Sequence, residues 1–149
     1  IMSLVAQLNA ALKRRLEANL IIAGEIVATE IRDSINRAPR GGKTYQRLNQ
    51  SGSYRTVKAS APGESPATDL GFLVRSIQIE PDLQNLRVRI LSLHSIAPYA
   101  KRLEYGDLSR GLQPRPFMRK GLQAKKNQVV SLVQNALNRA ILDMQGAQP

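Results

Sequence analysis

One short stretch of the chain contains residue types that bind phosphate in other proteins. It is the sequence GGKT at Gly41 to Thr44, which resembles the end of a phosphate-binding loop. Such a loop needs another glycine five residues before the second one, at a position that Arg37 occupies here. It also follows a buried strand, whereas this stretch follows a helical pattern. We therefore expect no nucleotide site.

The candidates for metal binding or proton transfer are equally weak. His94 is the single histidine, and no carboxylate lies near it in the sequence, so a surface or hydrogen-bonded structural role is the simpler interpretation. Glu104 and Asp107 are three residues apart, but catalytic carboxylate pairs need a cleft and shifted pKa values. Salt bridges to Lys101 or Arg102 are the default for them. We expect no enzyme activity, no metal and no cofactor.

Basic residues are the most unusual feature, because 22 Lys and Arg stand against 11 Asp and Glu, for a net charge of +11. Two stretches, between Asp33 and Glu64 and between Asp107 and Asp143, contain basic residues and no acid. Such patches attract nucleic acid or acidic protein surfaces, although a solvated basic face is an equally good interpretation. With two Phe, four Tyr and no Trp, stacking platforms for bases are hard to assemble. Any DNA contact would therefore be to phosphates.

Two long amphipathic helices must position these residues. Apolar residues recur at helical spacing from Leu4 to Ile35, which predicts a helix from Ser3 to Arg37 with Ser3 as its N-cap. At 1.5 Å per residue it would be roughly 50 Å long, more than a small domain needs to cover its core. A second apolar stripe from Met118 to Met144 predicts another helix, with Pro116 in its first turn.

The region between the helices predicts a long basic loop and a small sheet. Residues 38–68 are rich in Pro, Gly, Ser and Thr, which favours a long loop or extended arm, within which Tyr54 to Ser60 could form one strand or half of a hairpin. Asp69 is expected to cap a short helical turn. Residues 76–80 and 86–93 are expected to form an antiparallel hairpin with its break at 81–85, before a short helix at 99–105 that ends at Gly106.

Length and composition favour a single soluble domain over residues 1–149, with a flexible tail at 146–149. The expected fold class is α+β, with the two long helices packed on a small antiparallel sheet. No apolar run approaches the roughly 20 residues that span a bilayer, and residues 1–6 lack the pattern of a signal peptide. We therefore expect the protein to stay in the cell that makes it, without membrane contact. The chain has no cysteine, which excludes disulfides.

Three ordered stretches resemble a family of tailed-bacteriophage proteins, the tail-component or neck proteins that act in head-tail joining or tail completion. They are SAPGESPATDLGFLVRSI at Ser60 to Ile77, IAPYAKRLEYGD at Ile96 to Asp107, and PRPFMRKGL at Pro114 to Leu122. GGKTYQRL from Gly41 to Leu48 is a weaker fourth match. The resemblance covers about residues 41–141, and Leu70 departs from it by replacing a common Thr.

The resemblance implies a structural virion protein that forms a homomeric ring at the neck or upper tail and assembles in the host cytoplasm. Its partners would be head-connector, tail-terminator or tail-tube proteins, with non-specific contact to passing DNA. A basic nucleic-acid-binding module is the alternative. The candidate assembly residues are basic or aromatic residues of the loop and motif residues expected to be core or interface anchors: Arg40, Lys43, Tyr45, Arg47, Arg55, Tyr99, Leu103, Tyr105, Arg115, Phe117 and Arg119.

Overall fold

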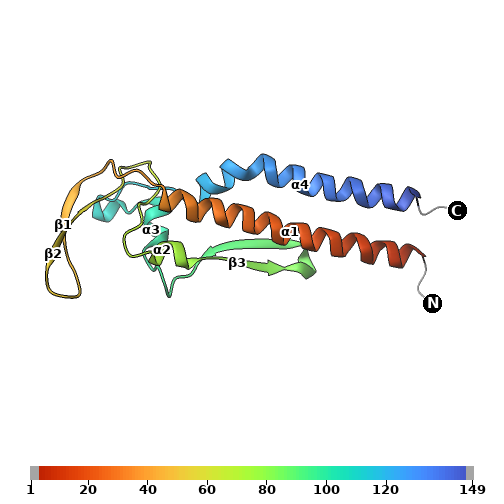
Figure 1. The fold of residues 1–149 in the computed structure, drawn as a ribbon, viewed down its shortest axis with the longest axis horizontal. Helices are drawn as coiled ribbons and strands as arrows, with labels where there is room; N and C mark the ends of the chain where they lie inside the picture. Colours follow the sequence, from red (N-terminus) through yellow and green to blue (C-terminus); the bar gives the residue numbers. More distant parts are fainter. Residues whose placement is uncertain (1–3, 147–149) are drawn as a thin grey trace.

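Two long antiparallel helices form the body of the molecule. The structure is a computed structural model that describes residues 4–146, and side chains from residue 9 to residue 143. Helix α1 spans Leu4–Asn36 and helix α4 spans Met118–Gly146. The start of α1 and the end of α4 lie at the same end of the pair (Figure 1). The expected cap at Ser3 and residues 147–149 of the expected tail lie outside the described residues, while Gly146 still belongs to α4.

Helix α1 supplies more of the core than any other element, because its apolar residues recur every three or four positions. Val27, Ala28, Ile31 and Ile35 are all buried in one cluster with residues of the following segments. Gly121 lets α4 approach closely, since a Cβ built there would lie 2.3 Å from Cγ1 of Ile31. The two helices therefore touch almost backbone to backbone at this point.

An antiparallel hairpin packs on α1 beside the helix pair. Strand β3 (Ile77–Asp82) pairs with strand β4 (Arg87–Ser92). Gly24 of α1 makes room for it, since a Cβ there would lie 2.6 Å from Cγ1 of Val88. Figure 1 shows α1 between α4 and this hairpin. The α+β class, with long terminal helices packed with a small antiparallel sheet, is thus confirmed.

The turn of this hairpin is shorter than the sequence predicts. Pro81 and Asp82 belong to β3, whereas Leu86, expected in the second strand, lies before β4 at a φ of 47°. The break therefore shifts to residues 83–86, with the short 3-10 helix η1 at Leu83–Asn85. The carboxylate of Asp82 explains the difference, because it accepts hydrogen bonds from Asn85 and, across the strands, from Arg87. These bonds hold the last residues of β3 in register.

The predicted long basic loop is not confirmed, because residues 38–68 contain a regular hairpin. Strands β1 (Thr44–Leu48) and β2 (Tyr54–Lys58) pair antiparallel. Its turn is closed by the side chain of Asn49, whose Oδ1 accepts hydrogen bonds from the backbone of Ser51 and Ser53. The hairpin, called the arm below (residues 44–58), projects beyond the ends of the helices (Figure 1).

Short elements connect the arm to the body. Helix α2 spans Phe72–Ser76 and helix α3 spans Ala100–Tyr105, with Gly106 after it as predicted. A 3-10 helix, η2, follows at Leu108–Arg110. Helix α4 begins at Met118, two residues later than predicted.

The expected cap at Asp69 is wrong, because α2 begins after Gly71 with no side-chain cap. The carboxylate of Asp69 pairs instead with two arginines of the arm.

Between residues 4 and 146, no helix has the length and apolarity that crossing a membrane requires.

Candidate assembly interface

The three stretches that carry the resemblance meet at one hydrogen-bonded junction. We define the junction as residues 60–64, 103–106 and 114–120. The amide of Gly63 donates to the carbonyl of Pro114 over 2.9 Å, and Nε of Arg115 donates to the carbonyl of Ser60 over 3.0 Å. The amide of Arg115 donates to the carbonyl of Leu103 over 2.7 Å. Segments far apart in the sequence thus share one backbone network.

Glu104 is the buried centre of the junction. Its carboxylate accepts hydrogen bonds from the backbone amides of Phe117, Met118 and Arg119, at 2.7, 3.0 and 3.2 Å, and from Nε of Arg119 at 3.0 Å. It therefore caps the first turn of α4, where amides lack partners within the helix. Burial alone would raise the pKa of the Glu104 carboxyl, but these hydrogen bonds outweigh burial and hold the pKa below its ordinary value.

The sequence expectations for this pair of acids are half right. Asp107 forms the expected ion pair with Arg102, at 3.7 Å, and a second one with Arg110. Glu104, by contrast, turns inward to α4 and pairs with Arg119. Sequence reasoning missed the capping role of Glu104 because the capped helix begins 14 residues later, at Met118. The one signal in the sequence was that the first turn of α4 contains no acid, so that an acid from an earlier segment could cap it.

Glycines in the GGKT stretch serve packing at the same junction. The amide of Gly41 donates to Oε2 of Glu64, which also accepts from the amide of Ala61 at 2.6 Å. A Cβ at Gly42 would lie 2.3 Å from the carbonyl oxygen of Ser60, so only glycine fits there. This stretch therefore anchors the base of the arm.

The aromatic and apolar candidates of the second and third motif stretches differ in how exposed their side chains are. Phe117 is 1% exposed and lies in the core, the first of the two roles expected for it. Tyr105 is exposed, and the guanidinium of Arg119 lies over its ring, 5.4 Å from the centroid. Tyr99 and half-buried Leu103 line a recess of about 240 Å³ together with Arg47. The structure thus brings two of the motif residues to the base of the arm.

The basic candidates of the arm are largely engaged by neighbouring residues. Arg47 and Arg55 lie directly opposite each other across the two strands, and both pair with Asp69. Arg40 donates to the carbonyl of Thr68 over 2.7 Å. The remaining candidates, Lys43 and Tyr45, are exposed. Sequence reasoning missed Asp69 as the partner of Arg47 and Arg55. Asp69 is the second acid, after Glu64, that follows the acid-free basic stretch.

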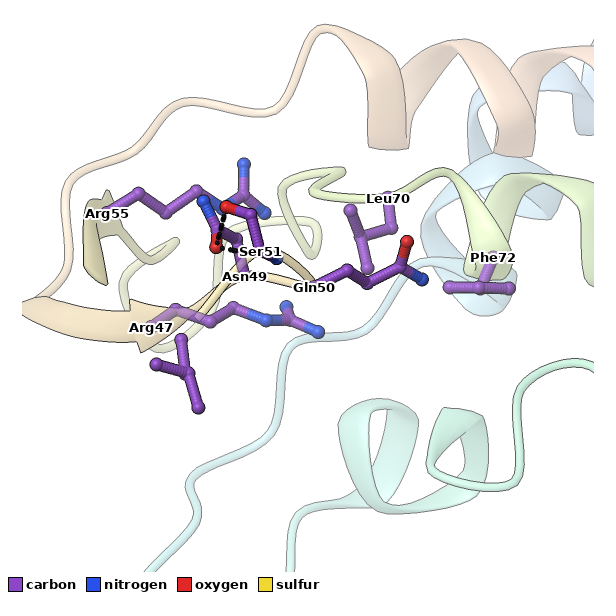
Figure 2. A pocket seen from close by; sticks show the side chains of 8 residues that line it. Arg47, Asn49, Gln50, Ser51, Arg55, Leu70 and Phe72 are labelled. Carbon is purple, nitrogen blue, oxygen red and sulfur yellow. Dashed lines mark hydrogen bonds between the residues drawn. The ribbon is translucent and has the colours of Figure 1, made fainter. Parts of the chain in front are cut away.

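An open pocket of about 710 Å³ lies between the arm and the segment that precedes α2. We call it the tip pocket, and Figure 2 shows Gln50 extending from the turn of the arm toward Leu70 and Phe72. Its lining combines arginines, polar turn residues and apolar side chains: Arg47, Leu48, Asn49, Gln50, Ser51, Arg55, Leu70 and Phe72.

A second exposed apolar surface runs along α4. We call it the α4 strip and define it by Leu122, Val130, Leu137 and Ile141, which are between 37% and 54% exposed. At about 100° per residue these four side chains fall within about 100° of one another around the helix. They therefore lie on one side of the helix, beside the face that packs on α1, with exposed Lys126 between Leu122 and Val130.

His94, the remaining candidate for metal binding or proton transfer, is exposed in a turn after β4. It lines a pocket of about 270 Å³ together with Glu104, whose carboxylate is already occupied by the amides of α4 and by Arg119. Between residues 4 and 146, no three acidic or histidine side chains are grouped as a metal ion requires. Comparison with protein-family models, with curated proteins and with solved structures finds no match.

Proposed function

We propose that this chain is a structural subunit of a tailed-phage virion, acting in head-tail joining or tail completion as part of a homomeric ring and without enzyme activity. The observation that carries the proposal is the junction. The three stretches that resemble the phage family are hydrogen-bonded to one another around Glu104 and Arg115. A set of motifs that forms one structural unit is a stronger pattern than three separate matches.

The distribution of exposed apolar residues supports a ring. A closed ring needs heterologous contacts, in which one surface of a subunit meets a different surface of the next. The α4 strip and the tip pocket are two such surfaces on different elements. Large apolar side chains of a monomer rarely gather in this way unless the surface binds another protein.

The test is removal of the gene from its phage or prophage, followed by electron microscopy of the lysate. The proposal predicts separate heads and tails in place of complete virions, restored by supplying the wild-type gene. Mass spectrometry of purified virions would detect the chain among the structural proteins. Complete virions at normal yield without the gene would refute the proposal. Loss of DNA replication or packaging instead would favour the nucleic-acid-binding alternative.

A further inference from the structure

We infer that the tip pocket docks a segment of a partner protein that carries acidic and apolar side chains. This deepens the proposed function, on which the identity of the partner as a neighbouring virion protein rests. The pocket itself is argued from three features: exposed apolar side chains, unneutralised positive charge and a rigid rim.

Three large apolar side chains line the pocket and are exposed to solvent. Leu48 is 56% exposed, Leu70 is 49% exposed and Phe72 is 44% exposed. They come from the arm and from the segment around α2, yet they line one cavity. Covering them with a leucine or phenylalanine of a partner removes apolar surface from water on both molecules, which favours binding.

The charge of the lining defines the rest of the partner. Among the described residues that line the pocket there are two arginines and no acid. Asp69 pairs with both Arg47 and Arg55, which leaves one positive charge in excess, and both arginine side chains are 42% exposed. Each guanidinium carries five N–H donors, more than one carboxylate can accept. A carboxylate on the partner therefore has donors and charge waiting for it.

The rim of the pocket is ordered before any partner arrives. Oδ1 of Asn49 accepts hydrogen bonds from the amide and hydroxyl of Ser51 (Figure 2). It also accepts one from the amide of Ser53. Gly52, at a φ of 78°, completes the turn. A preorganised rim lowers the entropy lost on binding.

The same features disfavour nucleic acid as the occupant. Phe72 is the single aromatic residue of the lining, and the guanidinium of Arg75 already lies over its ring, 4.8 Å from the centroid. Arg75 therefore occupies one face of the only ring on which a nucleobase could stack in this pocket. Phosphates would also leave Leu48 and Leu70 in water, whereas an acidic peptide with apolar residues covers them.

The experiment measures binding of fluorescent octapeptides to the full chain by anisotropy at about 0.15 M salt. One peptide alternates Glu with Leu and Phe, the second replaces Leu and Phe with Ser, the third replaces Glu with Gln, and a DNA duplex is the fourth probe. We expect the first peptide to bind at least about tenfold more tightly than either of the other two. Binding that is equal for all three peptides, or absent, would overturn the inference.

Variants then locate the site. Leu48→Ser and Arg55→Gln are each expected to weaken binding of the first peptide by about tenfold. Tyr54→Ser, an exposed change on the same arm outside the pocket, and Lys126→Gln, an exposed charge loss on α4, are the matched controls and should change it less than about twofold. Two outcomes would contradict the proposal by showing general charge attraction. One is a loss of peptide affinity in the control variants equal to that in the pocket variants. The other is a duplex that binds more tightly than the first peptide and whose affinity Leu48→Ser leaves unchanged. Because the peptides need no virion, these results are independent of the gene-removal experiment.

Discussion

Glu104 is the residue on which the junction depends most. It is 4% exposed and caps three amides of α4, so its replacement leaves buried donors without partners. Glu104→Ala is expected to lower the free energy of unfolding by about 2–3 kcal/mol at neutral pH. Glu64→Ala, at a partly exposed acid of the same junction, should cost less. Urea denaturation of both variants checks this, and equal losses would contradict the central role of Glu104.

The same carboxyl makes stability depend on pH. Its pKa is lower in the folded chain than in the unfolded chain, because hydrogen bonds outweigh burial. Its contribution is therefore fully present above the unfolded pKa of about 4.3 and is lost as the pH falls through the lower, folded pKa. Below about pH 4 the difference in unfolding free energy between wild type and Glu104→Gln should shrink. A difference that stays constant from pH 7 to pH 3 would show that another group causes acid destabilisation.

At the scale of elements, the arm is held to the body by Asp69. Arg47 and Arg55 repel each other across the strands unless a carboxylate lies between them. Asp69→Asn is expected to cost roughly 1 kcal/mol locally, because the partly exposed pairs are screened by solvent. Amide exchange in residues 44–58 should then accelerate about fivefold, while exchange in α1 and α4 stays unchanged. Asp33→Asn, at an exposed acid of α1, is the control. Unchanged exchange in the arm would contradict the tether.

The elements differ in how far sequence predicts them. Helices α1 and α4 and the β3–β4 hairpin follow from apolar periodicity, because each packs one face into the core. The arm shows almost no alternation, since Val57 is its single buried residue, so composition favoured a loop. The contacts of Glu104 with α4 and of Asp69 with the arm join residues 13 to 22 positions apart. Local patterns carry no information about such pairs.

The exposed α4 strip leads to a separate prediction about assembly. We expect the full chain to form homo-oligomers at tens of micromolar, with the α4 strip in the contact. Val130→Asp should shift the mass toward the monomer, because it places a charge in an apolar interface. Leu142→Asp is the control, since Leu142 is 63% exposed and lies about 100° beyond the nearest residue of the strip. Mass measurement in solution distinguishes the two, and equal effects of both variants would exclude the strip.

At the scale of the whole molecule, the net charge of +11 is unevenly distributed, because α1 has four basic and four acidic residues, whereas α4 carries a net +4 and the arm a net +3. Many of the basic side chains form intramolecular ion pairs, including both arginines of the arm that line the tip pocket. The isolated chain should therefore bind a DNA duplex only at the non-specific level, with a Kd of roughly 10–100 μM at about 0.15 M salt.

Salt titration tests this distribution of charge directly. Each Lys or Arg that neutralises a phosphate contributes about 0.9 to the slope of log K against log salt concentration. If Arg47 and Arg55 bind Asp69 and a protein partner instead of DNA, the double variant Arg47→Gln with Arg55→Gln should leave that slope nearly unchanged. A slope reduced by about 2, with sub-micromolar binding by the wild-type monomer, would instead make the arm a DNA-binding element. The ring would then lose one of its two supporting surfaces, because the tip pocket would bind DNA and only the α4 strip would remain for a subunit contact.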